Sequence, residues 1–181
     1  MGVLYTIQVP SKCRFDLLQV TLEHIREGKT QRKLAKAIKQ GRRHAHFMCQ
    51  NCCILGFAVR SDSGLVLTDK GRRFLDSGDR MKGLILAQSI LESPVVSMLI
   101  KHAGSLEEAA RMSQDDITEF LVENTLASTR KTAPIEAVTA RRRASSVKRW
   151  IEWLVNNAPT IPVNSALDEI DEPIDDLLAY Y

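Results

Sequence analysis

Glycine divides the first half of the sequence into short amphipathic segments, and this pattern limits the fold more than any other feature. In each segment apolar residues recur at the i, i+3, i+4 spacing that gives a helix one buried face. Gly28, Gly41 and Gly56 follow the segments, and glycine is the residue that most often ends a helix. The sequence therefore predicts three consecutive helices, over residues 14–27, 31–39 and 42–55.

Two β-prone runs follow the third of these segments. Residues 57–60 and 65–68 flank a polar turn that contains Gly64, which is typical of a β-hairpin. Thr68 can cap the N-terminus of a further helix, expected over residues 69–76. The order of elements is then three helices, a hairpin and a fourth helix.

Several short motifs accompany this order: Leu34-Ala35-x-x-Ile38, a turn at Gly41, Leu55-Gly56-Phe57 and Leu67-Thr68-Asp69-Lys70-Gly71. Together they resemble the winged helix-turn-helix superfamily over residues 14–78. The resemblance implies that the third helix enters the major groove of DNA and that the hairpin is a wing beside it. Arg and Lys can bind phosphates or guanine, and Gln and Asn can bind adenine. The candidate DNA-binding residues of this unit are Lys36, Lys39, Arg42, Arg43, His46, Gln50, Asn51 and Arg60.

The second half of the sequence predicts more helices. Their expected bounds are 80–92, 94–102, 106–112 and 114–124, and a polar loop through 128–134 leads to an arginine-rich helix over 139–154. Thr-Ala-x-Arg-Arg-Ala followed by Trp-x-x-Trp-Leu in that last helix resembles tandem winged-helix modules that accompany AAA ATPases and restriction or phage-defence enzymes. Residues 160–163 are a candidate wing strand. The expected fold is mainly α with a small β-hairpin wing, with two winged-helix-like units in tandem. The expected divisions are residues 1–78, 79–165 and an acidic, apolar C-terminal tail at 166–181.

The arginine-rich helix is a second candidate for binding a polyanion. Its apolar stripe faces a core, and Trp150 and Trp153 beside that stripe are expected to be core residues. Its basic side chains are expected to contact DNA phosphates, although a basic helix face often serves only solubility. These candidates are Arg141, Arg142, Arg143, Lys148 and Arg149.

Charge is distributed unevenly along the chain. The formal net charge is +3, but residues 158–181 contain six acidic residues and no Lys or Arg, which leaves a formal charge of +9 on residues 1–157. A basic body points to nucleic acid. The tail also carries large apolar residues, so docking on its own chain or on a partner is favoured over simple disorder.

Histidine and cysteine cluster within the third helical segment, at His44, His46, Cys49, Cys52 and Cys53. Cys-x-x-Cys is a zinc-binding spacing, but such cysteines normally lie on tight turns, and this stretch has no turn residue between Gly41 and Gly56. We therefore expect no metal and no other cofactor. Adjacent cysteines also suit a reducing compartment, so a cytoplasmic location is expected. No apolar run is long enough to cross a membrane, and no nucleophile or phosphate-loop motif suggests catalysis.

The sequence thus predicts a non-catalytic protein that binds double-stranded DNA with some sequence preference, as a transcriptional regulator or as a DNA-recognition accessory of a restriction or phage-defence system. A homodimer through the second unit or the tail, or a protein partner from a defence system, would fit this role. The alternative is a protein-protein adaptor whose basic surface binds an acidic partner or its own acidic tail.

Overall fold

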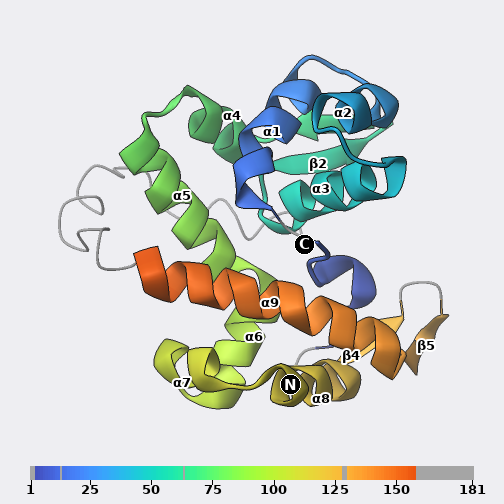
Figure 1. Cartoon of the computed structure of the whole chain (residues 1–181), viewed down its shortest axis with the longest axis vertical. Coiled ribbons are helices and arrows are strands. Elements are labelled where there is room, and N and C mark those ends of the chain that lie inside the picture. The colour runs from blue at the N-terminus through green and yellow to red at the C-terminus, as the bar shows by residue number, and fades with distance from the viewer. Residues whose placement is uncertain (1–2, 13, 63, 128–129, 158–181) are drawn as a thin grey trace.

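The computed structural model describes residues 3–12, 14–62, 64–127 and 130–157. Within these residues the chain is mainly helical, with one two-stranded and one three-stranded sheet (Figure 1). The expected class, mainly α with a small β-hairpin, is therefore confirmed at this level. The candidate wing strand at 160–163 and the tail at 166–181 lie outside the described residues.

The first half follows the predicted order within a few residues. The short 3-10 turn η2 leads into α1, and the β2–β3 pair is antiparallel with Val59 opposite Val66. Helix α4 has the predicted bounds. The elements are η2 (Phe15–Leu17), α1 (Leu18–Arg26), α2 (Gln31–Ala37), α3 (Arg42–Ile54), β2 (Ala58–Ser61), β3 (Gly64–Leu67) and α4 (Asp69–Asp76).

The Leu-Thr-x-x-Gly motif fastens α4 to the start of the hairpin. The Thr68 hydroxyl donates to the Gly56 carbonyl at 2.6 Å and accepts from the Gly71 amide at 3.1 Å, so it caps α4 as predicted. Gly71 lies directly against the backbone of Phe57, because a Cβ built there would come within 2.1 Å of the Phe57 carbonyl oxygen. The motif thus encodes a backbone contact that only glycine allows.

The second half repeats the same order of elements. After α5, helices α6, α7 and α8 lead to a hairpin and then to α9, just as α1, α2 and α3 lead to β2–β3 and then α4. The elements are α5 (Asp79–Glu92), α6 (Pro94–Ala103), α7 (Leu106–Arg111), α8 (Gln114–Asn124), β4 (Thr125–Ala127), β5 (Arg130–Pro134) and α9 (Ala137–Asn157).

The β4–β5 hairpin corrects the prediction of a polar loop through 128–134. Its strands pair antiparallel with a register shift between Leu126 and Ala127, so no regular alternation of apolar residues marks them. The hairpin gains a third strand from the N-terminus, because β1 (Leu4–Tyr5) pairs parallel with β4. A strand recruited from the far end of the chain leaves no local signal in the sequence.

The N-terminal strand is part of the sheet of the second half, a pairing that the expected division at residue 78 does not include. Leu4 lies opposite Thr125, and the Thr6 hydroxyl, in the 3-10 turn η1 (Thr6–Gln8), donates to the Leu126 carbonyl at 3.0 Å. Leu4 and Tyr5 therefore belong to the sheet of the second half, and Thr6 is hydrogen-bonded to it, although the sequence assigns all three to the first half. The chain crosses between the halves before α1 begins.

One main hydrophobic core runs through both halves. It includes buried residues from α1, α3 and β2 and from α5 to α9. Trp150 is fully buried, and the centroid of its ring lies 6.2 Å from that of Phe15. The ring centroid of Trp153 lies 5.3 Å from that of Phe15, so both tryptophans pack against the core as expected. A smaller cluster lies beneath α2 and α3, made by Leu34, Ala35, Ile38, Ala45, Met48 and Cys49.

Helices α5 and α6 meet at a bend of 67° at Ser93, with Pro94 in the first turn of α6 as predicted. Their buried residues include Ile90, Val95 and Leu99, which belong to the main core. Across the described residues no single helix has the length and apolar character needed to span a membrane, and only this bent pair, taken as one, meets that test of length and composition.

Candidate nucleic-acid interface

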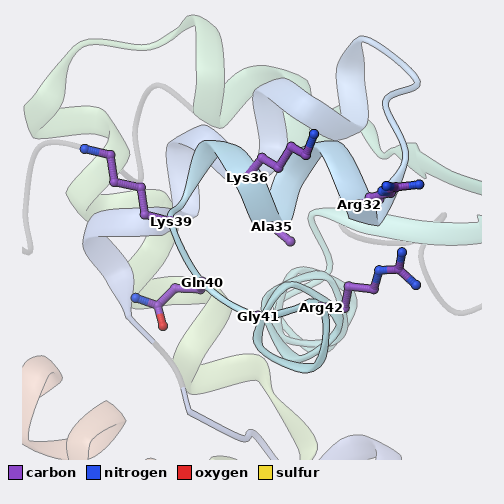
Figure 2. Close-up of a pocket in the computed structure, with 7 residues that line it drawn as sticks. All are labelled: Arg32, Ala35, Lys36, Lys39, Gln40, Gly41 and Arg42. Atoms are coloured by element: carbon purple, nitrogen blue, oxygen red, sulfur yellow. The ribbon is translucent and has the colours of Figure 1, made fainter.

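An open hollow lies between α2 and the N-terminal end of α3. It has a volume of about 550 Å³ and is lined by four basic residues together with Ala35, Gln40 and Gly41. Figure 2 looks almost along α3, with Arg32 and Arg42 on one side of the hollow and Lys39 on the other. We call this surface the cationic hollow, defined by Arg32, Ala35, Lys36, Lys39, Gln40, Gly41 and Arg42.

The four cations of the hollow are exposed, and none of them has a carboxylate partner among the described residues. Within the described part of the chain, no ion pair involves Arg32, Lys36, Lys39 or Arg42. Elsewhere in the same half, Arg26 pairs with Asp76 at 3.2 Å. Four unpaired positive charges around one hollow attract an anion with several negative groups more strongly than they attract a single one.

Helix α3 adds its own electrostatic contribution to the hollow. Gly41 is its N-cap and offers no side chain to the first turn, so the amide groups there are not capped by a side chain. The N-terminal end of a helix carries partial positive charge, and its free amides can bind an anion. The helix terminus and the four side chains therefore act in the same direction.

The turn between α2 and α3 places Lys39 at the rim in a costly conformation. Lys39 has a φ of +52°, the left-handed region that favours glycine. The backbone N–H of Gln40 donates to the Ala35 carbonyl at 2.9 Å, and the backbone N–H of Lys39 donates to the Lys36 carbonyl at 3.2 Å. This pair of hydrogen bonds is a Schellman C-cap. Lysine thus occupies the position where glycine would be more stable.

Two exposed basic residues of α2, Arg32 and Lys33, were not among the predicted candidates. Both are exposed on α2, and Arg32 lines the hollow. A signal for them exists in the sequence, because residues 28–61 contain eight Lys and Arg and no Asp or Glu. The run begins at Lys29, before α2, so a search centred on α3 and the residues just before it misses its beginning.

The prediction that Gln50 and Asn51 read bases is wrong, because both side chains are buried. They are 8% and 0% exposed. They hold the N-terminal segment, residues 7–11, against α3. The Gln50 amide donates to the Ile7 carbonyl at 2.8 Å, and the Asn51 amide donates to the Ser11 carbonyl at 3.0 Å while its oxygen accepts from the Ser11 amide at 3.2 Å. Residues 7–11 thus cover the face of α3 that the apolar pattern of the helix predicts to be exposed to solvent.

Three of the five basic side chains of α9 that were predicted to contact DNA phosphates already have partners within the described fold. Arg143 donates to the Val9 carbonyl, and burial lowers its pKa to about 10. The Lys148 ammonium donates to the Met112 carbonyl at 3.0 Å, and Arg141 lies 3.6 Å from the Asp115 carboxylate. Arg143 and Lys148 therefore hold the fold together, whereas the exposed Arg142 and Arg149 stay available.

The remaining candidates lie outside the hollow. Arg43 is exposed next to Arg42 and lies over the Phe47 ring at 5.5 Å, and His46 is exposed one turn further along α3. Arg60 is exposed on β2. Figure 1 shows α9 crossing the middle of the molecule, away from α2. The structure thus groups Lys36, Lys39 and Arg42 at the hollow with Arg43 beside them, but does not add α9 to this surface.

His44 gives the fold an expected sensitivity to mild acid. Burial lowers its pKa, and the nearby charges of Lys12 and Arg14 lower it further. Because the unfolded chain then binds the His44 proton more tightly, the free energy of unfolding should fall as the pH drops below about 6.5. We expect chemical denaturation at pH 7.5 and about 5.5 to show this loss, and the His44→Gln variant to show a smaller one. An equal loss in both proteins would contradict the assignment.

The cysteine and histidine cluster lies along one helix and does not converge. Cys49 and Cys52 are buried while His46 is exposed, and burial raises the pKa of Cys49 to about 11. Among the described residues, no group of three or more His, Cys, Asp or Glu is placed to hold a metal ion. Cys49 belongs to the small core beneath α2 and α3, and Cys52 belongs to the main core.

Comparison with known proteins identifies a family but no activity. A family model described as Domain of unknown function (DUF7226) matches residues 16–159. The match covers most of the chain, and the chain therefore belongs to that family. Searches of curated proteins and of solved structures gave no match.

Proposed function

We propose that this member of the DUF7226 family binds double-stranded DNA through the cationic hollow, without catalysing a reaction on it. In this proposal residues 14–78 form a winged helix-turn-helix unit, with α2 and α3 as the helix-turn-helix and β2–β3 as the wing. The second half is a diverged unit of the same kind. The protein would act in the cytoplasm as a transcriptional regulator or as a DNA-recognition accessory of a restriction or phage-defence system.

The observation that carries the proposal is the set of four cations around the hollow that form no ion pair with any described residue. The four side chains, Arg32, Lys36, Lys39 and Arg42, come from α2, the following turn and α3. They lie beside the end of α3 that a helix-turn-helix protein inserts into the major groove. Phosphates along DNA are regularly spaced anions, and neutralising them releases counterions. A surface of this kind is suited to such a ligand and less suited to a small neutral one.

Sequence preference in this proposal depends on fewer residues than the sequence suggests. With Gln50 and Asn51 buried, the exposed candidates at the reading end of α3 are Arg42, Arg43 and His46. Arginine binds the O6 and N7 atoms of guanine in a bidentate manner, which is worth about 1–3 kcal/mol of discrimination per base pair. A preference for guanine within a short site is therefore expected.

The second half is expected to contribute little to DNA binding. Its α7 and α8 together carry six acidic residues and one basic residue, so the counterpart of the reading helix is negatively charged. Arg142 and Arg149 on α9 are the exposed cations that would add weaker phosphate contacts. This contrast between two units of the same element order supports a protein that engages DNA from one half.

The direct test is fluorescence anisotropy with a labelled duplex of about 20 base pairs over a series of salt concentrations. If each cation of the hollow neutralises one phosphate, log K should fall against log salt with a slope of about −3 to −4. Selection from random duplexes should enrich guanine-containing sites. Absence of duplex binding at about 50 mM salt, together with tight binding of an acidic polypeptide such as polyglutamate, would instead favour the adaptor function.

Lys39 allows the contribution to binding to be separated from the contribution to stability. In the Lys39→Gly variant the left-handed residue becomes glycine, so the free energy of unfolding should rise by about 1 kcal/mol. The same variant should bind duplex more weakly, with a salt slope smaller in magnitude by about 0.9 because one phosphate contact is lost.

The matched control for this prediction is Lys33→Gln, which removes an exposed α2 charge outside the lining of the hollow. This control should change duplex binding less than Lys39→Gly. A Lys39→Gly protein that is more stable and binds duplex as tightly as the parent would remove Lys39 from the interface.

A further inference from the structure

The chain itself contains a second polyanion that can reach the cationic hollow. Residues 158–181 follow α9 and contain no Lys or Arg. We call them the acidic segment. Their six carboxylates fall within nine consecutive positions, at Asp168, Glu169, Asp171, Glu172, Asp175 and Asp176. The density of negative charge over this stretch is of the kind that the hollow is suited to bind.

The length of the segment is sufficient for contact within one molecule. Helix α9 ends at Asn157, and the fifteen residues from there to Glu172 can span about 50 Å when extended. A folded body of this size is about 40 Å across. A tether of this length keeps its attached group at an effective concentration on the order of millimolar, so even a weak contact is substantially populated.

Within the described residues, several positive charges outside the hollow are less available to this segment than the four of the hollow. Several are already held by carboxylates or carbonyls, among them Arg26 with Asp76, Lys70 with Glu92 and Lys148 with the Met112 carbonyl. The surface of α7 and α8 repels the segment because it is itself acidic. The hollow offers four cations that no carboxylate of the described body engages.

We propose that the acidic segment occupies the cationic hollow of its own chain and competes there with DNA. This inference rests on the proposed function, because it assigns a regulator to the same surface. DNA must displace the segment in order to bind, so the resting affinity for duplex is lower than the hollow alone would give. A duplex with several well-placed phosphates or a guanine contact displaces the segment more readily than a poor site.

The first test uses two full-length variants with the same net charge. One neutralises the acidic segment. The other neutralises six exposed acids of the folded body whose side chains form no hydrogen bond or ion pair with the described residues. The first set is D168N, E169Q, D171N, E172Q, D175N and D176N, and the control set is D79N, E107Q, E119Q, E123Q, E136Q and E152Q.

Neutralising the segment should tighten duplex binding about 10-fold at about 100 mM salt, because the competing intramolecular contact is removed. The control set should produce a clearly smaller gain, since it changes net charge without freeing the hollow. Equal gains in both variants would show that only net charge matters and would overturn the proposal.

The second test measures the contact without DNA. A fluorescent peptide with the sequence of residues 158–181 is titrated into the segment-neutralised full-length protein, whose hollow is free. The peptide should bind at micromolar to millimolar concentrations. Binding should weaken at least 10-fold when R32Q, K36Q, K39Q and R42Q are added. Equal binding with and without these four substitutions would place the segment elsewhere and overturn the proposal.

These two tests separate failure of the inference from failure of the proposed function. Peptide binding at the hollow with no duplex binding would support the contact and remove DNA as the ligand. Duplex binding at the hollow with no peptide binding would keep the proposed function and overturn the inference. A gain in duplex affinity that appears only at protein concentrations where the parent chain is dimeric would show exchange between copies and overturn the contact within one chain.

Discussion

Replacing Gly71 by alanine should destabilise the fold by about 2–4 kcal/mol, the largest stability effect that we expect from any single added methyl group in this chain. The added Cβ would lie 2.1 Å from the Phe57 carbonyl oxygen, far inside van der Waals contact. Backbone on both sides must move, because no flexible side chain stands between them. The higher helix propensity of alanine would return about 1 kcal/mol, which is smaller than this cost.

The Gly83→Ala variant is the matched control for this prediction. Gly83 lies inside α5, and a Cβ built there has nothing within 4 Å. The same substitution should therefore raise the free energy of unfolding by about 0.5–1 kcal/mol. Urea denaturation of the two variants measures the contrast. A Gly71→Ala protein as stable as the parent would mean that α4 and the hairpin are not joined as described.

The first half could be predicted from sequence because its signals are local. Thr68 and Gly71 mark the start of α4 within four residues, and glycines mark the ends of α1 and α3. Apolar spacing fixes the buried faces of α2 and α3 through residues such as Leu34 and Met48, which are 1% and 0% exposed. Each of these signals acts over one or two helical turns, so a single sequence is sufficient to read it.

The remaining features depend on residues far apart in the chain. Strand β1 pairs with β4 although Leu4 and its partner Thr125 lie 121 residues apart in the sequence. Asn51 is buried because Ser11 covers it. The Arg143 side chain holds the same segment by donating a hydrogen bond to the Val9 carbonyl. Three of the predicted DNA-binding residues, Gln50, Asn51 and Arg143, therefore hold the N-terminal segment in place. Sequence spacing gives the direction of a side chain but not which segment will pack against it.

Removing the four cations of the hollow together is expected to have the largest effect on binding. The variant R32Q, K36Q, K39Q and R42Q should bind every duplex about 100-fold or more weakly at about 100 mM salt, because up to four phosphate contacts are lost at once. Its salt slope should be smaller in magnitude by about 3 to 4. The four side chains are exposed and form no ion pair among the described residues, so the fold should keep its stability.

A control with the same loss of charge separates a local interface from a general attraction. The variant R80Q, K101Q, R142Q and R149Q removes four exposed cations from α5, α6 and α9, including the two free arginines of α9. If DNA lies at the hollow, this control keeps most of the affinity and most of the salt slope. If both variants lose the same affinity and the same slope, phosphate contacts are spread over the whole basic body. In that case the α2–α3 surface holds no special position, and the resemblance to a helix-turn-helix reader carries no functional meaning for this chain.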